Sequence, residues 1–156
     1  MSIVIGLKAP FFSLYDTNKK LINISDYDGK NILLLFFPQA FTSVCTKELC
    51  SIRDDITRYS NVNAEVFGIS VDSVYTLKKF KEDQHYNFTL LSDFNKEVSD
   101  SYECLYKEWI LGMKGVSKRA AFIIDKKGIL QYAEVLQEAG EIPNFKAINE
   151  KLASLS

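Results

Sequence analysis

The segment "NILLLFFPQAFTSVCTKELC" (31–50) decides the fold. It opens with a continuous apolar run from Ile32 to Phe37, which is typical of a strand that is buried on both faces of a sheet. Pro38 ends this strand, because proline has no N–H to donate to a neighbouring strand. From Thr42 onward the apolar residues recur at helical spacing. The segment therefore predicts a central strand that is followed, after a short connection, by a helix.

Strands and helices alternate on both sides of this segment. Upstream, "APFFSLYDTNKKLINIS" predicts two short strands around a turn. Downstream, a helix from Thr42 to about Tyr59 precedes a buried strand, a helix that Ser73 caps, a third strand, a short helix, a β-hairpin and a last helix that Pro143 opens. The later elements are expected in "AEVFGISV", "FTLLSD", "NKEVSDSYECLY" and the hairpin "AAFIID"–"ILQYAEV". This order predicts an α/β protein with a thioredoxin-like fold: a central mixed β-sheet flanked by helices on both faces, with an N-terminal β-hairpin.

Length and composition limit the classes of function. The chain of 156 residues is expected to form a single domain that spans 1–156. Its formal net charge of −1 provides no basic surface for nucleic acid or for a membrane. The longest apolar run is far shorter than the roughly 20 residues that cross a bilayer, and the N-terminus lacks the pattern of a secretory leader. We therefore expect a cytoplasmic protein without nucleic-acid or membrane partners.

The cysteines carry the first chemical signal. Their odd number, three, does not suit a disulfide framework, and each could be a plain core residue. Cys45, however, falls in the first turn of the predicted helix, where free N–H groups and the helix dipole stabilise a thiolate. Lowering a thiol pKa from about 8.5 to about 6 raises the ionised fraction at pH 7 roughly thirtyfold. Cys45 is therefore expected to be reactive.

Three further residues can complete a site around this thiol. Thr42 lies three positions before Cys45, so its hydroxyl and the thiol can share one face of the first turn. Pro38 would close the site on an apolar side. A guanidinium could hold the thiolate and polarise a substrate, and Arg119 is the candidate because it directly precedes a predicted strand. Spacing alone favours a solvent-exposed Arg119 over one in the site.

These residues resemble a known family. "PQAFTSVC" (38–45) fits the P-x-x-x-T-x-x-C signature of the peroxiredoxins, and "KRAAFIIDKKGIL" (118–130) is similar to their second block. The resemblance runs through most of the chain and implies a thiol peroxidase without metal or organic cofactor.

The resemblance also implies roles for individual residues. Cys45 would attack the terminal oxygen of hydrogen peroxide or an organic hydroperoxide and become a sulfenic acid. Thr42 and Arg119 would position the peroxide, Pro38 would shield the thiolate, and Glu48 would orient the arginine. Glu48 also fits an ordinary carboxylate in the first turns of a helix.

The second half of the catalytic cycle has two interpretations. "CTKELC" (45–50) has the spacing of the Q-type, or bacterioferritin-comigratory, subgroup, which implies that Cys50 resolves the sulfenic acid as an intramolecular disulfide. Five residues of intact helix give about 7.5 Å of rise and about 140° of rotation. The two Cα atoms would then lie beyond the roughly 7 Å that a disulfide can bridge, so the helix must unwind. The chain also resembles the alkyl hydroperoxide reductase E-type subgroup, which implies a one-cysteine cycle.

The partners follow from these alternatives. Thioredoxin would suit an intramolecular disulfide, whereas glutaredoxin or a low-molecular-weight thiol would suit a one-cysteine cycle.

Cys104 is expected to be a core or surface thiol, with a role as backup resolver as the alternative. The protein is expected to be a monomer or a homodimer. The alternative from a different class is a catalytically idle binding module on the same fold.

Overall fold

The computed structural model of the protein describes residues 3–155, apart from the side chain of Cys45. Within this range the strands form one seven-stranded mixed sheet in the order β2-β1-β5-β4-β3-β6-β7. The three central strands β5, β4 and β3 are parallel, and the outer strands pair antiparallel. The strands are β1 (Ser13–Asp16), β2 (Leu21–Asn23), β3 (Asn31–Phe36), β4 (Ala64–Ser70), β5 (Thr89–Ser92), β6 (Ala120–Ile124) and β7 (Leu130–Val135).

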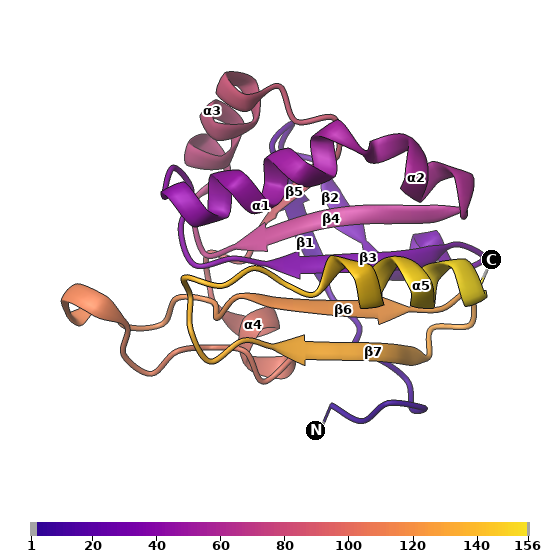
Figure 1. Cartoon of the computed structure of the whole chain (residues 1–156). Coiled ribbons are helices and arrows are strands. Elements are labelled where there is room, and N and C mark those ends of the chain that lie inside the picture. The colour runs from indigo at the N-terminus through magenta and orange to yellow at the C-terminus, as the bar shows by residue number, and fades with distance from the viewer. Residues whose placement is uncertain (1–2, 156) are drawn as a thin grey trace.

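Helices cover both faces of this sheet (Figure 1). Four helices pack on one face: α1 (Ser43–Asp54), α2 (Ile56–Asn61), α3 (Val74–Gln84) and α5 (Phe145–Leu155). The other face carries α4 (Glu97–Ser101) and the 3₁₀ helix η1 (Ile24–Tyr27). A second 3₁₀ turn, η2 (Ile110–Gly112), lies in the connection between α4 and β6. The mixed α/β fold expected from the sequence is therefore confirmed.

The central strand β3 contributes side chains to two hydrophobic cores, one on each face of the sheet. All of its residues are buried, because side chains of a strand alternate between the two faces. Leu33 and Leu35 pack against the four helices of the first face. Ile32, Leu34 and Phe36 pack on the opposite face, in the core that contains α4. An uninterrupted apolar run is what such a two-sided position requires.

The two hairpins and the cap of α3 agree with the sequence analysis. Strands β1 and β2 pair antiparallel around the first turn, and β6 and β7 form the later hairpin. The Ser73 hydroxyl accepts a hydrogen bond from the backbone N–H of Thr76 at 3.2 Å, which caps α3.

Two element boundaries differ from the sequence analysis. The helix expected from Thr42 to Tyr59 is interrupted at Asp55, whose φ of −127° and ψ of 26° separate α1 from α2. At the break the backbone N–H of Asp55 donates to the Ile52 carbonyl three residues back, in place of the four-residue bond of an α-helix. Helix α5 begins at Phe145 and not at Pro143, because the Asn144 side chain caps it by accepting a hydrogen bond from Ala147.

Within residues 3–155, no helix combines the length and the apolar composition that a membrane span requires.

Candidate active site

The connection between β3 and α1 presents the start of α1 at one end of the sheet. Pro38 is buried directly after the strand, and Phe41 adopts a positive φ of 67° that turns the chain. Thr42 is the N-cap of α1, with the extended backbone that this position favours. Cys45 therefore lies in the first turn of α1, as the sequence predicts. Its side chain lies outside the described part of the structure.

The position of Cys45 has an electrostatic consequence. The backbone N–H groups of a first helical turn have no partner within the helix, and the helix dipole is positive there. A negatively charged group at this position gains from both effects.

A carboxylate from the next strand holds the connection in place. Asp72 follows β4, and its Oδ2 accepts a hydrogen bond from the backbone N–H of Ala40 at 2.8 Å. The same oxygen accepts from the Ser70 hydroxyl at 2.6 Å. The sequence analysis missed Asp72. Its place immediately after a buried parallel strand is the signal that could have found it, since neighbouring parallel strands end at the same edge of the sheet.

The Thr42 hydroxyl has a defined orientation. Its Oγ1 donates a hydrogen bond to the Gln39 carbonyl at 2.9 Å. Because the proton is engaged there, the oxygen presents its lone pairs to the space at the start of α1. The Thr42 oxygen can therefore accept a hydrogen bond from a molecule bound in this space.

Arg119 and Glu48 form a buried ion pair. Nη1 of Arg119 donates to Oε1 of Glu48 at 2.7 Å, and the two side chains are 2% and 0% exposed. Nε of Arg119 donates to the Ala139 carbonyl at 3.0 Å. The alternative of a solvent-exposed Arg119 is therefore wrong. A buried guanidinium must be paired, and Glu48 and Ala139 fix its plane from two sides.

The buried environment of Glu48 raises the pKa of its carboxyl. Complete burial raises the pKa of the Glu48 carboxyl to about 7, although the Arg119 guanidinium acts in the opposite direction. The second carboxylate oxygen, Oε2, has no hydrogen-bond partner among the described residues. Burial thus outweighs the ion pair at this carboxyl.

A pocket of about 510 Å³ brings Thr42 and Arg119 together. Its walls come from three places: the start of α1, the connection around η2, and the segment that follows β7. Tyr106 and Trp109 stack at 6.0 Å on the η2 side. Glu48 and Pro38 are buried and are not among the residues that line the pocket. The sequence analysis did not single out 137–140, whose carbonyl at Ala139 orients Arg119.

The other two cysteines belong to opposite faces of the sheet. Cys50 lies half-buried on α1 and packs against the core under the four helices. Cys104 is fully buried in the core of the other face, where burial raises the pKa of its thiol. The sheet therefore separates Cys104 from α1.

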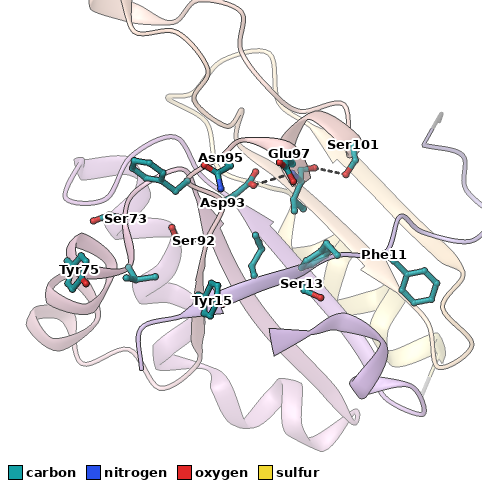
Figure 2. Close-up of a pocket in the computed structure, with 15 residues that line it drawn as sticks. Phe11, Ser13, Tyr15, Ser73, Tyr75, Ser92, Asp93, Asn95, Glu97 and Ser101 are labelled. Carbon is teal, nitrogen blue, oxygen red and sulfur yellow. Dashed lines mark hydrogen bonds between the residues drawn. The ribbon is translucent and has the colours of Figure 1, made fainter. Parts of the chain in front are cut away.

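A second pocket, of about 610 Å³, lies elsewhere on the molecule (Figure 2). Figure 2 shows Phe11, Tyr15 and Tyr75 at its walls and Asp93 at its inner end. The Asp93 carboxylate accepts hydrogen bonds from the backbone N–H groups of Val98 and Ser99, so it caps α4. No cysteine or arginine is among the described residues that line this pocket, so it offers no thiol chemistry.

Comparison with known proteins identifies the family of the chain. A family model described as "AhpC/TSA family" matches residues 5–133. The chain belongs to this family, the peroxiredoxins. It is a thiol-dependent peroxidase, and the alternative of an idle binding module is not retained.

Named relatives and solved structures agree with this family. The peroxiredoxin is 34% identical to "Alkyl hydroperoxide reductase E" of Mycobacterium tuberculosis, with 97% of each chain covered. It is 37% identical to "Putative peroxiredoxin bcp" of Coxiella burnetii, over 83% of this chain and 87% of the relative. Its fold is similar to the crystal structure of "Peroxidoxin BcpB" from Mycobacterium tuberculosis, with a TM-score of 0.85, 26% identity and 97% of each chain covered.

Proposed function

We propose that this peroxiredoxin reduces hydrogen peroxide and organic hydroperoxides through Cys45, with Thr42 and Arg119 as the groups that hold the substrate. The observation that carries the proposal is the pocket at the start of α1, which is lined by both Thr42 and Arg119. Arg119 is fixed there by Glu48 and by the Ala139 carbonyl. A fixed cation beside a helix N-terminus is suited to stabilising both a thiolate and an oxyanion.

The first step follows from this arrangement. The Cys45 thiolate attacks the terminal oxygen of the hydroperoxide, an S–O bond forms and the O–O bond breaks. The sulfur is oxidised to sulfenic acid, and the other oxygen takes up a proton and leaves as water or an alcohol. Arg119 stabilises the negative charge on the departing oxygen, and the Thr42 oxygen accepts a hydrogen bond from the peroxide. Pro38 keeps water from the thiolate by closing the apolar side.

We further propose that Cys50 resolves the sulfenic acid. Cys45 and Cys50 both belong to α1, and an intact helix holds their Cα atoms too far apart for a disulfide. The first turns of α1 must therefore unwind in each cycle. The alternative is a one-cysteine cycle, in which an external thiol reduces the sulfenic acid directly.

The electron donor and assembly are proposed on the same basis. An intramolecular disulfide fits thioredoxin as the reductant, and a one-cysteine cycle fits glutaredoxin or a low-molecular-weight thiol. Both a monomer and a homodimer are compatible with the proposed cycle. We also propose a cytoplasmic location, because the odd number of three cysteines does not suit the disulfide framework of an oxidising compartment.

Intact mass after one equivalent of hydrogen peroxide tests the proposed cycle. We expect the wild type to lose about 2 Da as the disulfide forms, and Cys50→Ser to gain about 16 Da as a sulfenic acid. A stable gain of about 16 Da in both proteins would leave a one-cysteine peroxidase. If Cys45→Ser consumes peroxide as fast as the wild type, the assignment of Cys45 is wrong.

A further inference from the structure

The end of α3 and the residues that follow it are bonded to the side of α1 that carries Cys50. Nη1 of Arg53 donates to the Gln84 carbonyl at 2.6 Å. The Asn87 amide donates to the Arg53 carbonyl at 3.1 Å. These two bonds hold the second half of α1 against the segment that follows α3. They leave the side chains of Gln84 and Tyr86 facing the preceding turn of α1.

Those two side chains contact the Cys50 thiol. The Sγ atom of Cys50 lies 3.6 Å from Oε1 of Gln84 and 3.7 Å from the hydroxyl of Tyr86. The Tyr86 hydroxyl also donates to the Thr46 carbonyl at 3.4 Å. Thr46 and Cys50 are four residues apart, so this one hydroxyl spans the turn of helix that must open before Cys50 can move.

Tyr86 is rigidly held in the core. Its side chain is 4% exposed, and its ring meets Phe80 edge-on at 5.1 Å and Phe88 at 5.3 Å. An aromatic ring fixed on two sides cannot follow α1 when that helix unwinds. The contacts to Thr46 and Cys50 therefore break when the first turns open.

We propose that Gln84 and Tyr86 act as positioning residues that hold Cys50 in its helical place and thereby set the rate at which the disulfide forms. This inference rests on the proposed role of Cys50 as resolver. We call the two side chains the Cys50 latch. The latch favours the folded start of α1, in which Arg119, Thr42 and the first turn meet the peroxide, over the unwound state, in which Cys50 can reach the sulfenic acid.

Two reactions compete for the sulfenic acid, and the latch sets their balance. In resolution, the Cys50 sulfur attacks the sulfenic sulfur, an S–S bond forms, the S–O bond breaks and water leaves with the thiol proton. In overoxidation, a second hydroperoxide transfers one oxygen to the sulfenic sulfur, which becomes a sulfinic acid, while water or an alcohol is released. Overoxidation uses the folded site, whereas resolution needs the unwound helix. A weaker latch therefore favours resolution.

Tyr86→Phe and Gln84→Met test the latch with little change in packing. Each removes a polar contact to α1 while keeping a side chain of similar size, and a single hydrogen bond shifts such an equilibrium about two- to tenfold. In rapid mixing with excess hydrogen peroxide, we expect disulfide formation to become about two- to tenfold faster in either variant. The peroxide concentration that gives half sulfinic acid should rise by the same factor, and the rate of sulfenic acid formation should not change.

Tyr59→Phe is the matched control. Tyr59 is a buried tyrosine of α2 in the same core, and its hydroxyl makes no hydrogen bond to α1 within the described residues. The Tyr59→Phe variant should keep the wild-type rates of sulfenic acid formation and of disulfide formation, even if its thermal unfolding shifts as much as that of Tyr86→Phe. If Tyr86→Phe folds poorly, the rate of disulfide formation in Gln84→Met alone tests the latch.

The outcomes separate the two proposals. A wild-type disulfide whose rate of formation is unchanged or slower in the latch variants overturns the latch and leaves Cys50 as resolver. If the wild type forms no disulfide, the role of Cys50 fails and the latch fails with it.

Discussion

The guanidinium of Arg119 lies 2.7 Å from the carboxylate of Glu48, although the two residues are 71 positions apart in the sequence. Glu48 comes from the second turn of α1, and Arg119 directly precedes β6, which pairs antiparallel with β3. The pair therefore joins the helix that carries Cys45 to the sheet. It keeps a cation at the pocket at the start of α1 and ties the orientation of that cation to the intact helix.

Replacing Arg119 by lysine should impair the first oxidation. Lysine keeps the charge but loses the planar fork that contacts Glu48 and the Ala139 carbonyl at once. Loss of one fixed donor to a developing oxyanion typically lowers the rate about 100- to 1,000-fold, so we expect a fall of that order in kcat/KM for hydrogen peroxide. Arg58→Lys, at an exposed ion pair of α2, is the matched control and should keep wild-type kinetics. Equal kinetics in both variants would contradict a role for Arg119.

The stability of the protein should depend on pH through Glu48. Its folded pKa of about 7 lies above the ordinary value of 4.5, so the folded state binds the proton more tightly than the unfolded state. The contribution of the Glu48 carboxyl to the free energy of unfolding is fully present below about pH 4.5, and it is lost as the pH rises through 7. The loss is at most roughly 3–4 kcal/mol, from about 1.4 kcal/mol for each unit of the pKa difference between 4.5 and about 7.

Urea unfolding at several pH values between 5 and 8 measures this dependence. Glu48→Gln cannot ionise, so its free energy of unfolding should fall less over this range than that of the wild type. Glu141→Gln, at an exposed carboxylate, should keep the wild-type slope. Parallel curves for wild type and Glu48→Gln would show that Glu48 is already ionised in the folded protein at pH 5.

The sequence predicts those parts of the site that lie close together along the chain. The apolar run of β3, the stop at Pro38 and a helix start close to Thr42 follow from local chemistry, and they place Cys45 in the first turn of α1. The break at Asp55 could not be predicted from spacing, because the apolar positions continue across it. The backbone leaves the helical conformation at Asp55 without a change in the hydrophobic pattern.

Contacts between distant segments are the part that the sequence does not predict. The burial of Arg119 depends on Glu48 and Ala139, which reach it only once α1 and the segment after β7 pack together. In the same way, Tyr86 looks like one more aromatic core residue until its hydroxyl is placed beside Cys50. The hydrogen-bond partner of a polar atom on a long side chain depends on how distant segments pack together. The periodicity of apolar residues in the sequence does not indicate that partner.

Asp72 should support catalysis although it is remote from the thiol in sequence. Its carboxylate holds the backbone N–H of Ala40 and the Ser70 hydroxyl, so it fixes the connection that leads to Thr42. In Asp72→Ala both donors lose their partner, which costs about 1–3 kcal/mol for each buried group left unpaired. We expect a fall of about tenfold or more in kcat/KM for hydrogen peroxide, since small misplacements of reacting groups are costly.

The control for Asp72 is Asp83→Ala, at an exposed carboxylate of α3 that forms an ion pair with Lys79. It should retain wild-type kinetics and stability. If Asp72→Ala unfolds earlier in urea but oxidises Cys45 at the wild-type rate, Asp72 supports the fold without positioning the site.

Cys104 should be inert in the native protein. Burial raises the pKa of its thiol, so at neutral pH it stays protonated, and the thiol form is a poor nucleophile. Native iodoacetamide labelling followed by mass mapping should modify Cys50 much faster than Cys104, and the difference should vanish in urea. Cys104→Ala should keep the wild-type rate of disulfide formation after peroxide treatment, because the sheet separates Cys104 from α1. A disulfide that contains Cys104 in Cys50→Ser would instead show that it can serve as a backup resolver, which would require this face of the core to open.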